Sequence, residues 1–208
     1  MERFEDAMRQ GGEPALKELE RFFMGADKVH QALHRIAGRL GELGIPYAIA
    51  GGMALNAHGF HRATVDVDIL VTQEGLSAIH AALEGLGYVP PFTGSKQLRD
   101  VESSVRIEFL VAGQFPGDGK PKPVAFPDPA NVSVEIDGIR YLKLTTLIEL
   151  KLASGMTNAG RLKDLADVQE LIRVLRLDRD FASQLNEYVR AKYLEMWDAV
   201  TNSVDPEA

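Results

Sequence analysis

The segment that most constrains the fold is AIAGGMALNAHGFHRATVDVDILV, residues 48–71. An apolar run ends at Gly51 and Gly52, a short helical stretch follows, and a β-branched run then carries Asp66 and Asp68. Side chains two apart on a strand point to the same face, so the two carboxylates converge. Buried carboxylates are unfavourable unless a cation pairs with them. This unit therefore either ends its strand in solvent or holds positive charge.

Periodicity and turn signals surround this unit with further elements. We expect helices over 28–43, 74–87, 145–154, 161–175 and about 181–200, and strands over 47–50, 65–71, 103–111 and, as a hairpin around Asp137-Gly138, 132–142. A stretch rich in Pro and Gly, 113–131, predicts a long loop. Strands followed by helices indicate an α+β or α/β-like core. We expect an N-terminal helical segment (1–43), a core (44–143) and a helical C-terminal subdomain (144–208).

The composition of this 208-residue chain limits the compartment and the kinds of partner that we expect for it. It has no cysteine, which excludes disulfides and thiolate metal sites. No apolar run approaches the roughly 20 residues of a membrane span, and the N-terminus carries acids where a secretory signal is basic and apolar. We therefore expect a cytoplasmic protein with no membrane partner. A net charge of −7 argues against a surface that coats nucleic acid, but a local basic site remains open.

The glycine pair and the aspartate pair indicate a function more clearly together than either does alone. Two carboxylates on one face can hold Mg²⁺ or Mn²⁺, although such a pair is also common at an exposed strand end or in a turn. Glycines at a strand-to-helix junction let backbone N–H groups approach a phosphate, although a tight turn would need them too. Neither a P-loop nor a GxGxxG turn is present. A phosphate cradle beside a carboxylate pair nevertheless favours chemistry on a metal-bound nucleotide.

The run GG (51–52), a short helix and RATVDVD (62–68) resembles the signature of the DNA polymerase β-like nucleotidyltransferase superfamily. Its RxTxDhD form is similar to that of minimal nucleotidyltransferases and of AbiEii-type toxins from abortive-infection and toxin–antitoxin systems. The resemblance implies a small mixed sheet flanked by helices, with an NTP as substrate. The positions matching the nucleotide-binding residues are Gly51, Gly52, Arg62 and Thr64. Many members carry Ser after the first glycine, whereas this chain has Gly52 and lacks that hydroxyl.

The resemblance also implies three metal-binding carboxylates. Asp66 and Asp68 match the first two, and Glu108 in VRIEFLV, with Arg106 on the same face, matches the third. All three would be catalytic, Glu108 by activating the attacking hydroxyl. The alternative is that Glu108 faces solvent on an edge strand.

The stretch ELKLASGMTNAGRLKDLADV is similar to an AbiEii-type pattern, a lysine in one helix and R-x-K-D-x-x-D in the next. The match implies that Lys151 is catalytic and meets the nucleotide phosphates. It also implies that Asp164 or Asp167 orients a basic partner or a substrate group. The alternative is ordinary surface chemistry, with Lys151 beside Glu149 on a solvated helix and Lys163 paired with Asp167.

These resemblances imply transfer of NMP from an NTP to an acceptor hydroxyl, with release of pyrophosphate. The implied acceptor is RNA, such as a tRNA 3′ end, or a protein, and a cognate antitoxin is a possible partner. A small molecule such as an aminoglycoside is the alternative acceptor. A catalytically silent binding or antitoxin-like module also remains open. A nucleotide-hydrolysing switch is disfavoured because the chain has no Walker motif.

Overall fold

The computed structural model describes residues 28–202, so residues 1–27 of the predicted N-terminal segment lie outside the described residues. A seven-stranded sheet forms the core, in the order β3-β4-β5-β2-β1-β7-β6. Its strands are β1 (Ala48–Ile49), β2 (Asp66–Val71), β3 (Tyr88–Val89), β4 (Gln97–Asp100), β5 (Arg106–Val111), β6 (Ser133–Ile136) and β7 (Ile139–Leu142). The helices are α3 (Lys28–Glu42), α4 (Gly51–Ala57), α5 (Gln73–Leu83), α6 (Pro129–Val132), α7 (Leu144–Thr157), α8 (Leu162–Leu175) and α9 (Glu187–Asn202), with 3₁₀ turns η1 (Ala159–Arg161) and η2 (Arg179–Gln184).

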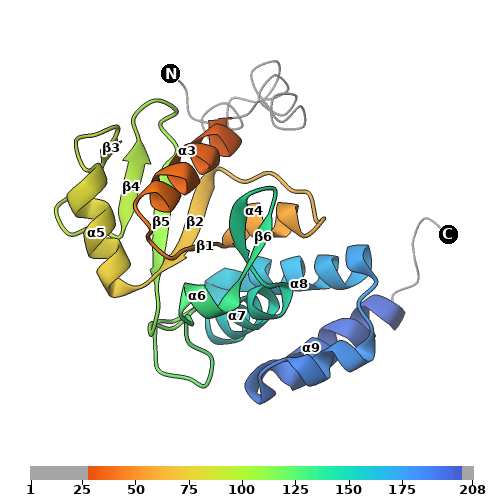
Figure 1. Cartoon of the computed structure of the whole chain (residues 1–208). Helices are drawn as coiled ribbons and strands as arrows, with labels where there is room; N and C mark the ends of the chain where they lie inside the picture. Colours follow the sequence, from red (N-terminus) through yellow and green to blue (C-terminus); the bar gives the residue numbers. More distant parts are fainter. Residues whose placement is uncertain (1–27, 203–208) are drawn as a thin grey trace.

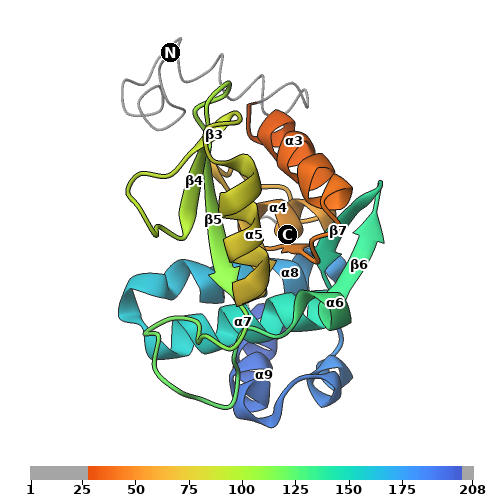
Figure 2. The same cartoon turned by 60° about the vertical axis from the view of Figure 1, so that its left-hand side comes forward.

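The sheet is mixed, which confirms the predicted fold class. Strand β2 runs parallel to β5 and antiparallel to β1, while β1 runs parallel to β7. Helices α3 and α5 lie together against the sheet, and α7, α8 and α9 stack beyond its lower end (Figures 1 and 2). Helix α7 begins immediately after β7. The cleft described below lies where these C-terminal helices meet the sheet.

Burial explains why the central strand loses its alternation. Asp66 and Asp68 alternate with the fully buried Val67, but Ile69, Leu70 and Val71 are all buried. A strand covered on both faces becomes continuously apolar. The apolar stripe of α3 packs on this core through Val29, Leu33, Ile36 and Leu40, as its helical spacing predicts.

Three details differ from the sequence-based expectation. Strands β3 and β4 are not predicted, because they are short and β4 (QLRD) has no β-branched residue. Pairing of β4 with β5, and of β3 with β4, stabilises them. Helix α5 ends at Leu83 rather than 87, since Gly85 and Gly87 adopt positive φ. The last helix is preceded by η2 and starts at Glu187. The 113–131 loop is confirmed, with only α6 near its end.

Within residues 28–202, no helix combines the length and apolarity needed to cross a membrane.

Two leucine truncations test this account of the core. Leu70 is fully buried on β2, whereas Leu86 is 69% exposed after α5. We expect Leu70→Ala to lower the free energy of unfolding by about 3 kcal/mol, since it leaves a cavity. The same change at Leu86 should alter it by less than about 0.5 kcal/mol. Urea unfolding measures both, and equal effects would contradict the position of β2 in the core.

Candidate active site

A cleft of about 540 Å³ opens between the sheet and helices α7 and α8. It gathers most residues singled out from the sequence, although they lie far apart along the chain. The predicted residues that line it are Gly51, Gly52, Arg62, Thr64, Asp66, Asp68, Glu108, Lys151 and Asp164. Asp167 is outside the lining and contacts it through Arg62 and Lys151.

The parallel register of β2 and β5 places the carboxylates. Asp68 is paired with Glu108, and Asp66 with Arg106. Because side chains two apart share a face, all four enter the same cleft. Strand β5 lies between β4 and β2, so Glu108 is not on an edge strand. The structure thus brings the three predicted carboxylates to one site.

The three carboxylates differ in their partners. Asp66 accepts a hydrogen bond from Arg106 Nη2 at Oδ2 and a longer one from Thr64 Oγ1 at Oδ1, 3.3 Å. Asp68 and Glu108 have no hydrogen-bond or ion-pair partner for their side chains within residues 28–202. Burial raises the pKa of Asp68 to about 7, and the charges of Asp66 and Glu108 add to this. Asp66 therefore has a cation bonded to it, whereas Asp68 and Glu108 have none among the described residues.

Gly51 and Gly52 allow the side chains of Asp68 and Thr64 to pack directly against the backbone. Gly51 has φ +56°, and a Cβ there would lie 1.8 Å from Asp68 Oδ2. A Cβ on Gly52 would lie 2.6 Å from Thr64 Oγ1. The Thr64 hydroxyl thus fills the space in which a side chain at position 52 would begin. This close packing accounts for glycine at position 52.

Lys151 is not a solvated helix residue. It is only 7% exposed, and its Nζ donates to Asp164 Oδ1 (2.9 Å) and Asp167 Oδ2 (2.7 Å). Ser154, one turn along α7, donates to the other oxygen of Asp164 at 2.7 Å. Buried charges require such pairing and hydrogen bonding. Two of the three N–H groups of Lys151 are thereby used within the protein.

Asp167 joins this network to the segment that precedes Asp66. Arg62 Nε lies 3.1 Å from Asp167 Oδ1, and Arg62 Nη2 donates to Oδ2 at 3.2 Å. Asp167 is 4% exposed and is shared by Arg62 and Lys151, so it does not form the pair with Lys163 that the alternative interpretation required. Two cations and two carboxylates therefore connect the 62–68 motif to α7 and α8.

Some lining residues were missed from the sequence. The long loop contributes Pro116, Gly117 and Phe126 to the cleft, and Asn158 Nδ2 donates to the Gly117 carbonyl at 3.2 Å. No local sequence signal connects this loop to α7. The sequence indicated that Arg106 lies on the same face of its strand as Glu108. It did not indicate that Arg106 bonds to Asp66, because that contact depends on the pairing of β2 with β5.

The donor set fits a hard divalent cation. Carboxylate oxygens are the ligands that Mg²⁺ and Mn²⁺ prefer, and Asp68 and Glu108 lack a cation. Within the described part of the chain, no group of three or more His, Asp or Glu side chains is placed to hold a metal ion by itself. The site thus suits an ion that takes one or two carboxylates and completes its shell with substrate phosphate oxygens.

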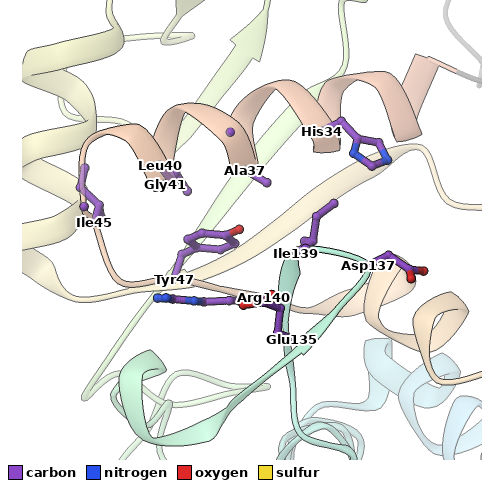
Figure 3. A pocket seen from close by; sticks show the side chains of 13 residues that line it. His34, Ala37, Leu40, Gly41, Ile45, Tyr47, Glu135, Asp137, Ile139 and Arg140 are labelled. Carbon is purple, nitrogen blue, oxygen red and sulfur yellow. The ribbon is translucent and has the colours of Figure 1, made fainter.

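A second hollow, of about 500 Å³, lies between α3 and the β6–β7 hairpin (Figure 3). Tyr47 points into it, and Glu135, Asp137 and Arg140 stand on the hairpin side. None of the predicted site residues lines this hollow. The chemistry is therefore assigned to the first cleft.

Glycine at position 51 can be tested directly. We expect Gly51→Ala to lower the free energy of unfolding by about 1–3 kcal/mol, because φ is positive and the new Cβ meets Asp68. The penalty should shrink when Asp68→Ala removes the opposing carboxylate. Gly41→Ala is the matched control, since an added Cβ there meets nothing within 4 Å. It should be neutral or stabilising. Equal penalties in both Asp68 backgrounds would contradict the close approach.

The raised pKa of Asp68 predicts a pH dependence of stability. The carboxyl has a pKa of about 7 when folded and 3.8 ordinarily, so the folded state holds a proton between these pH values that the unfolded state has lost. Its contribution to stability is therefore lost as pH rises through about 7. Without divalent metal, Asp68→Asn should gain stability relative to the parent from about pH 4 to about pH 8. Parallel unfolding curves across this range would contradict the assignment.

No protein-family model and no curated protein sequence matches the chain. Solved structures do. The crystal structure of ANT(2″)-Ia in complex with adenylyl-2″-tobramycin matches with a TM-score of 0.52 at 16% identity, over 80% of this chain and 97% of that one. A solution structure of the antibiotic-resistance factor ANT(2″)-Ia matches with a TM-score of 0.52 at 17% identity, over 81% and 92%. At this identity the likeness concerns the fold alone, which this chain shares with ANT(2″)-Ia.

Proposed function

We propose that the protein is a metal-dependent nucleotidyltransferase that transfers NMP from an NTP to an acceptor hydroxyl. The observation that carries the proposal is the β2–β5 register, which sets Glu108 opposite Asp68 beside Asp66 in one cleft. The Gly51–Gly52 turn lines the same cleft. A silent binding module would not need a third carboxylate in this position, so the arrangement favours an enzyme.

The three carboxylates would bind the metal and accept a proton. Asp66 and Asp68 would hold Mg²⁺ or Mn²⁺, with Glu108 as the third carboxylate. When bound, the ion neutralises phosphate charge and stabilises the attacking and leaving oxygens. Glu108 would also accept the proton of the acceptor hydroxyl. That oxygen then forms a bond to the α-phosphorus as the bond to the β-phosphate oxygen breaks, and pyrophosphate leaves.

The remaining residues position the nucleotide. The backbone at Gly51 and Gly52 would border the triphosphate. Lys151 keeps one N–H that is not given to Asp164 or Asp167, and that N–H is available for a phosphate oxygen. Arg62 and Thr64 complete the wall of the cleft. Because Asp167 holds both Arg62 and Lys151, it acts as a positioning residue.

For the acceptor we propose RNA, such as a tRNA 3′ end, or a protein. The AbiEii-like pattern in the two C-terminal helices supports this choice, together with a role as a cytoplasmic toxin that a cognate antitoxin restrains. The second candidate acceptor is an aminoglycoside. The shared fold of ANT(2″)-Ia, which was crystallised with adenylyl-2″-tobramycin, favours it. The two candidates differ in the product that carries the label.

The test uses each α-³²P-labelled NTP in turn, with Mg²⁺ and either total cellular RNA, total protein or an aminoglycoside. We expect label on one acceptor with one preferred base. The double variant Asp66→Ala, Asp68→Ala should lower the rate at least about a thousandfold, because it removes the charge that holds the metal. Asp198→Ala is the control and should retain activity, because Asp198 is an exposed residue of α9 outside the cleft.

Transfer that persists in the double variant would overturn the proposed mechanism. Label on the aminoglycoside alone would replace the RNA or protein acceptor and keep the mechanism. Absence of label with every acceptor, together with no release of pyrophosphate, would favour the silent binding module.

A further inference from the structure

The structure places a cation inside the carboxylate cluster. Arg106 is the first residue of β5 and lies in register with Asp66 on β2. Its Nη2 donates to Asp66 Oδ2, while Thr64 bonds the other oxygen. Both oxygens of Asp66, the first predicted metal ligand, are therefore already used by donors of the protein.

Arg62 and Arg106, two of the three arginines that line the cleft, differ in how firmly they are held. The Arg62 side chain is 19% exposed and binds Asp167, which is buried and also bound by Lys151. The Arg106 side chain is 43% exposed, and its recorded partner, Asp66, is 19% exposed. An ion pair open to solvent contributes little net stability, so a competing ligand can replace it. Arg62 is thus fixed, whereas Arg106 can leave its carboxylate.

Among the described residues, Arg106 is the only cation bonded to Asp66, Asp68 or Glu108, although Arg161 and Lys163 also line the cleft. Lys151 faces the same cleft but is committed to Asp164 and Asp167. Without Arg106, the three carboxylates Asp66, Asp68 and Glu108 would face one another with no directly bonded cation from the described residues. Repulsion among them favours a cation at this point. A divalent ion and the Arg106 guanidinium therefore compete for Asp66.

We propose that Arg106 is a positioning residue that occupies the cation position at Asp66 in the free protein and opposes metal binding until nucleotide phosphates take its guanidinium. The proposal rests on the function proposed above. Guanidinium binds phosphate oxygens in a bidentate way, so an incoming triphosphate offers Arg106 a better partner than one carboxylate oxygen. Metal and nucleotide would then each raise the affinity of the protein for the other. Such coupling limits occupation of the site by metal alone.

The test is the affinity for Mn²⁺ in the absence of nucleotide. Electron paramagnetic resonance measures it by detecting the Mn²⁺ that stays free. We expect R106Q to bind Mn²⁺ about tenfold more tightly than the parent, since one charged hydrogen bond no longer competes. R106M should behave alike, and serves if R106Q does not fold. R106K keeps the charge and should stay within about threefold of the parent.

The matched control is R99Q. Arg99 on β4 is in register with Arg106, and its Nη1 donates to the Ser104 carbonyl at 2.7 Å. Its removal changes the net charge equally without freeing Asp66, so we expect Mn²⁺ affinity within about twofold of the parent. Circular dichroism and thermal unfolding of each variant confirm that it is folded.

Mn²⁺ binding by R106Q and R106M that is equal to or weaker than that of the parent would overturn the proposal. So would a gain of the same size in R99Q, which would show a general charge effect. The double variant Asp66→Ala, Asp68→Ala separates this failure from that of the proposed function. If it binds Mn²⁺ as the parent does, the metal lies elsewhere and both proposals fail. If it loses Mn²⁺ while R106Q shows no gain, the role of Arg106 alone is wrong.

Discussion

The structure of the site depends on the parallel pairing of β2 with β5. Strand pairing fixes which residues lie opposite one another, and a slip by one residue would move every side chain to the other face. Here the register sets Asp68 opposite Glu108 and Asp66 opposite Arg106. The same slip would bring Val67 and Ile107 out of the core, so burial of the apolar residues holds the acidic residues in place. The core thus enforces a cluster of like charges that would otherwise separate.

That cluster is tolerated because other parts of the chain compensate for it. Arg106 bonds Asp66 directly, while Arg62 and Lys151 are balanced by Asp164 and Asp167 one layer away. The two networks meet at the 62–68 segment, which carries both Arg62 and Asp66. The network around Asp167 is buried, whereas the pair of Arg106 with Asp66 is partly exposed to solvent. The nucleotidyltransferase activity proposed above, which needs a metal and a triphosphate to bind and products to leave, would use both kinds of contact.

Much of this arrangement could be predicted from the sequence. The period of two in VDVDILV placed both aspartates on one face, and the spacing of Arg106 and Glu108 placed them together on the next strand. The two short strands β3 and β4 could not be predicted, because QLRD carries no local strand preference and depends on its contact with β5. Lys151 was open to two interpretations, since an isolated helix looks the same whether its lysine faces water or a carboxylate pair. Burial against α8 decided between them.

The sequence by itself determined which chemical groups are present and which of them share a face, because those properties follow from residue type and from the local periods of helix and strand. It therefore pointed to carboxylates, to glycines at a strand-to-helix turn and to the sheet class. Only the tertiary structure decided which side chains contact one another. Asp167 forms ion pairs with Arg62 and Lys151 rather than with Lys163 on its own helix, and Thr64 fills the space beside Gly52. Such choices depend on distances between segments far apart in the chain, which packing sets and local pattern does not.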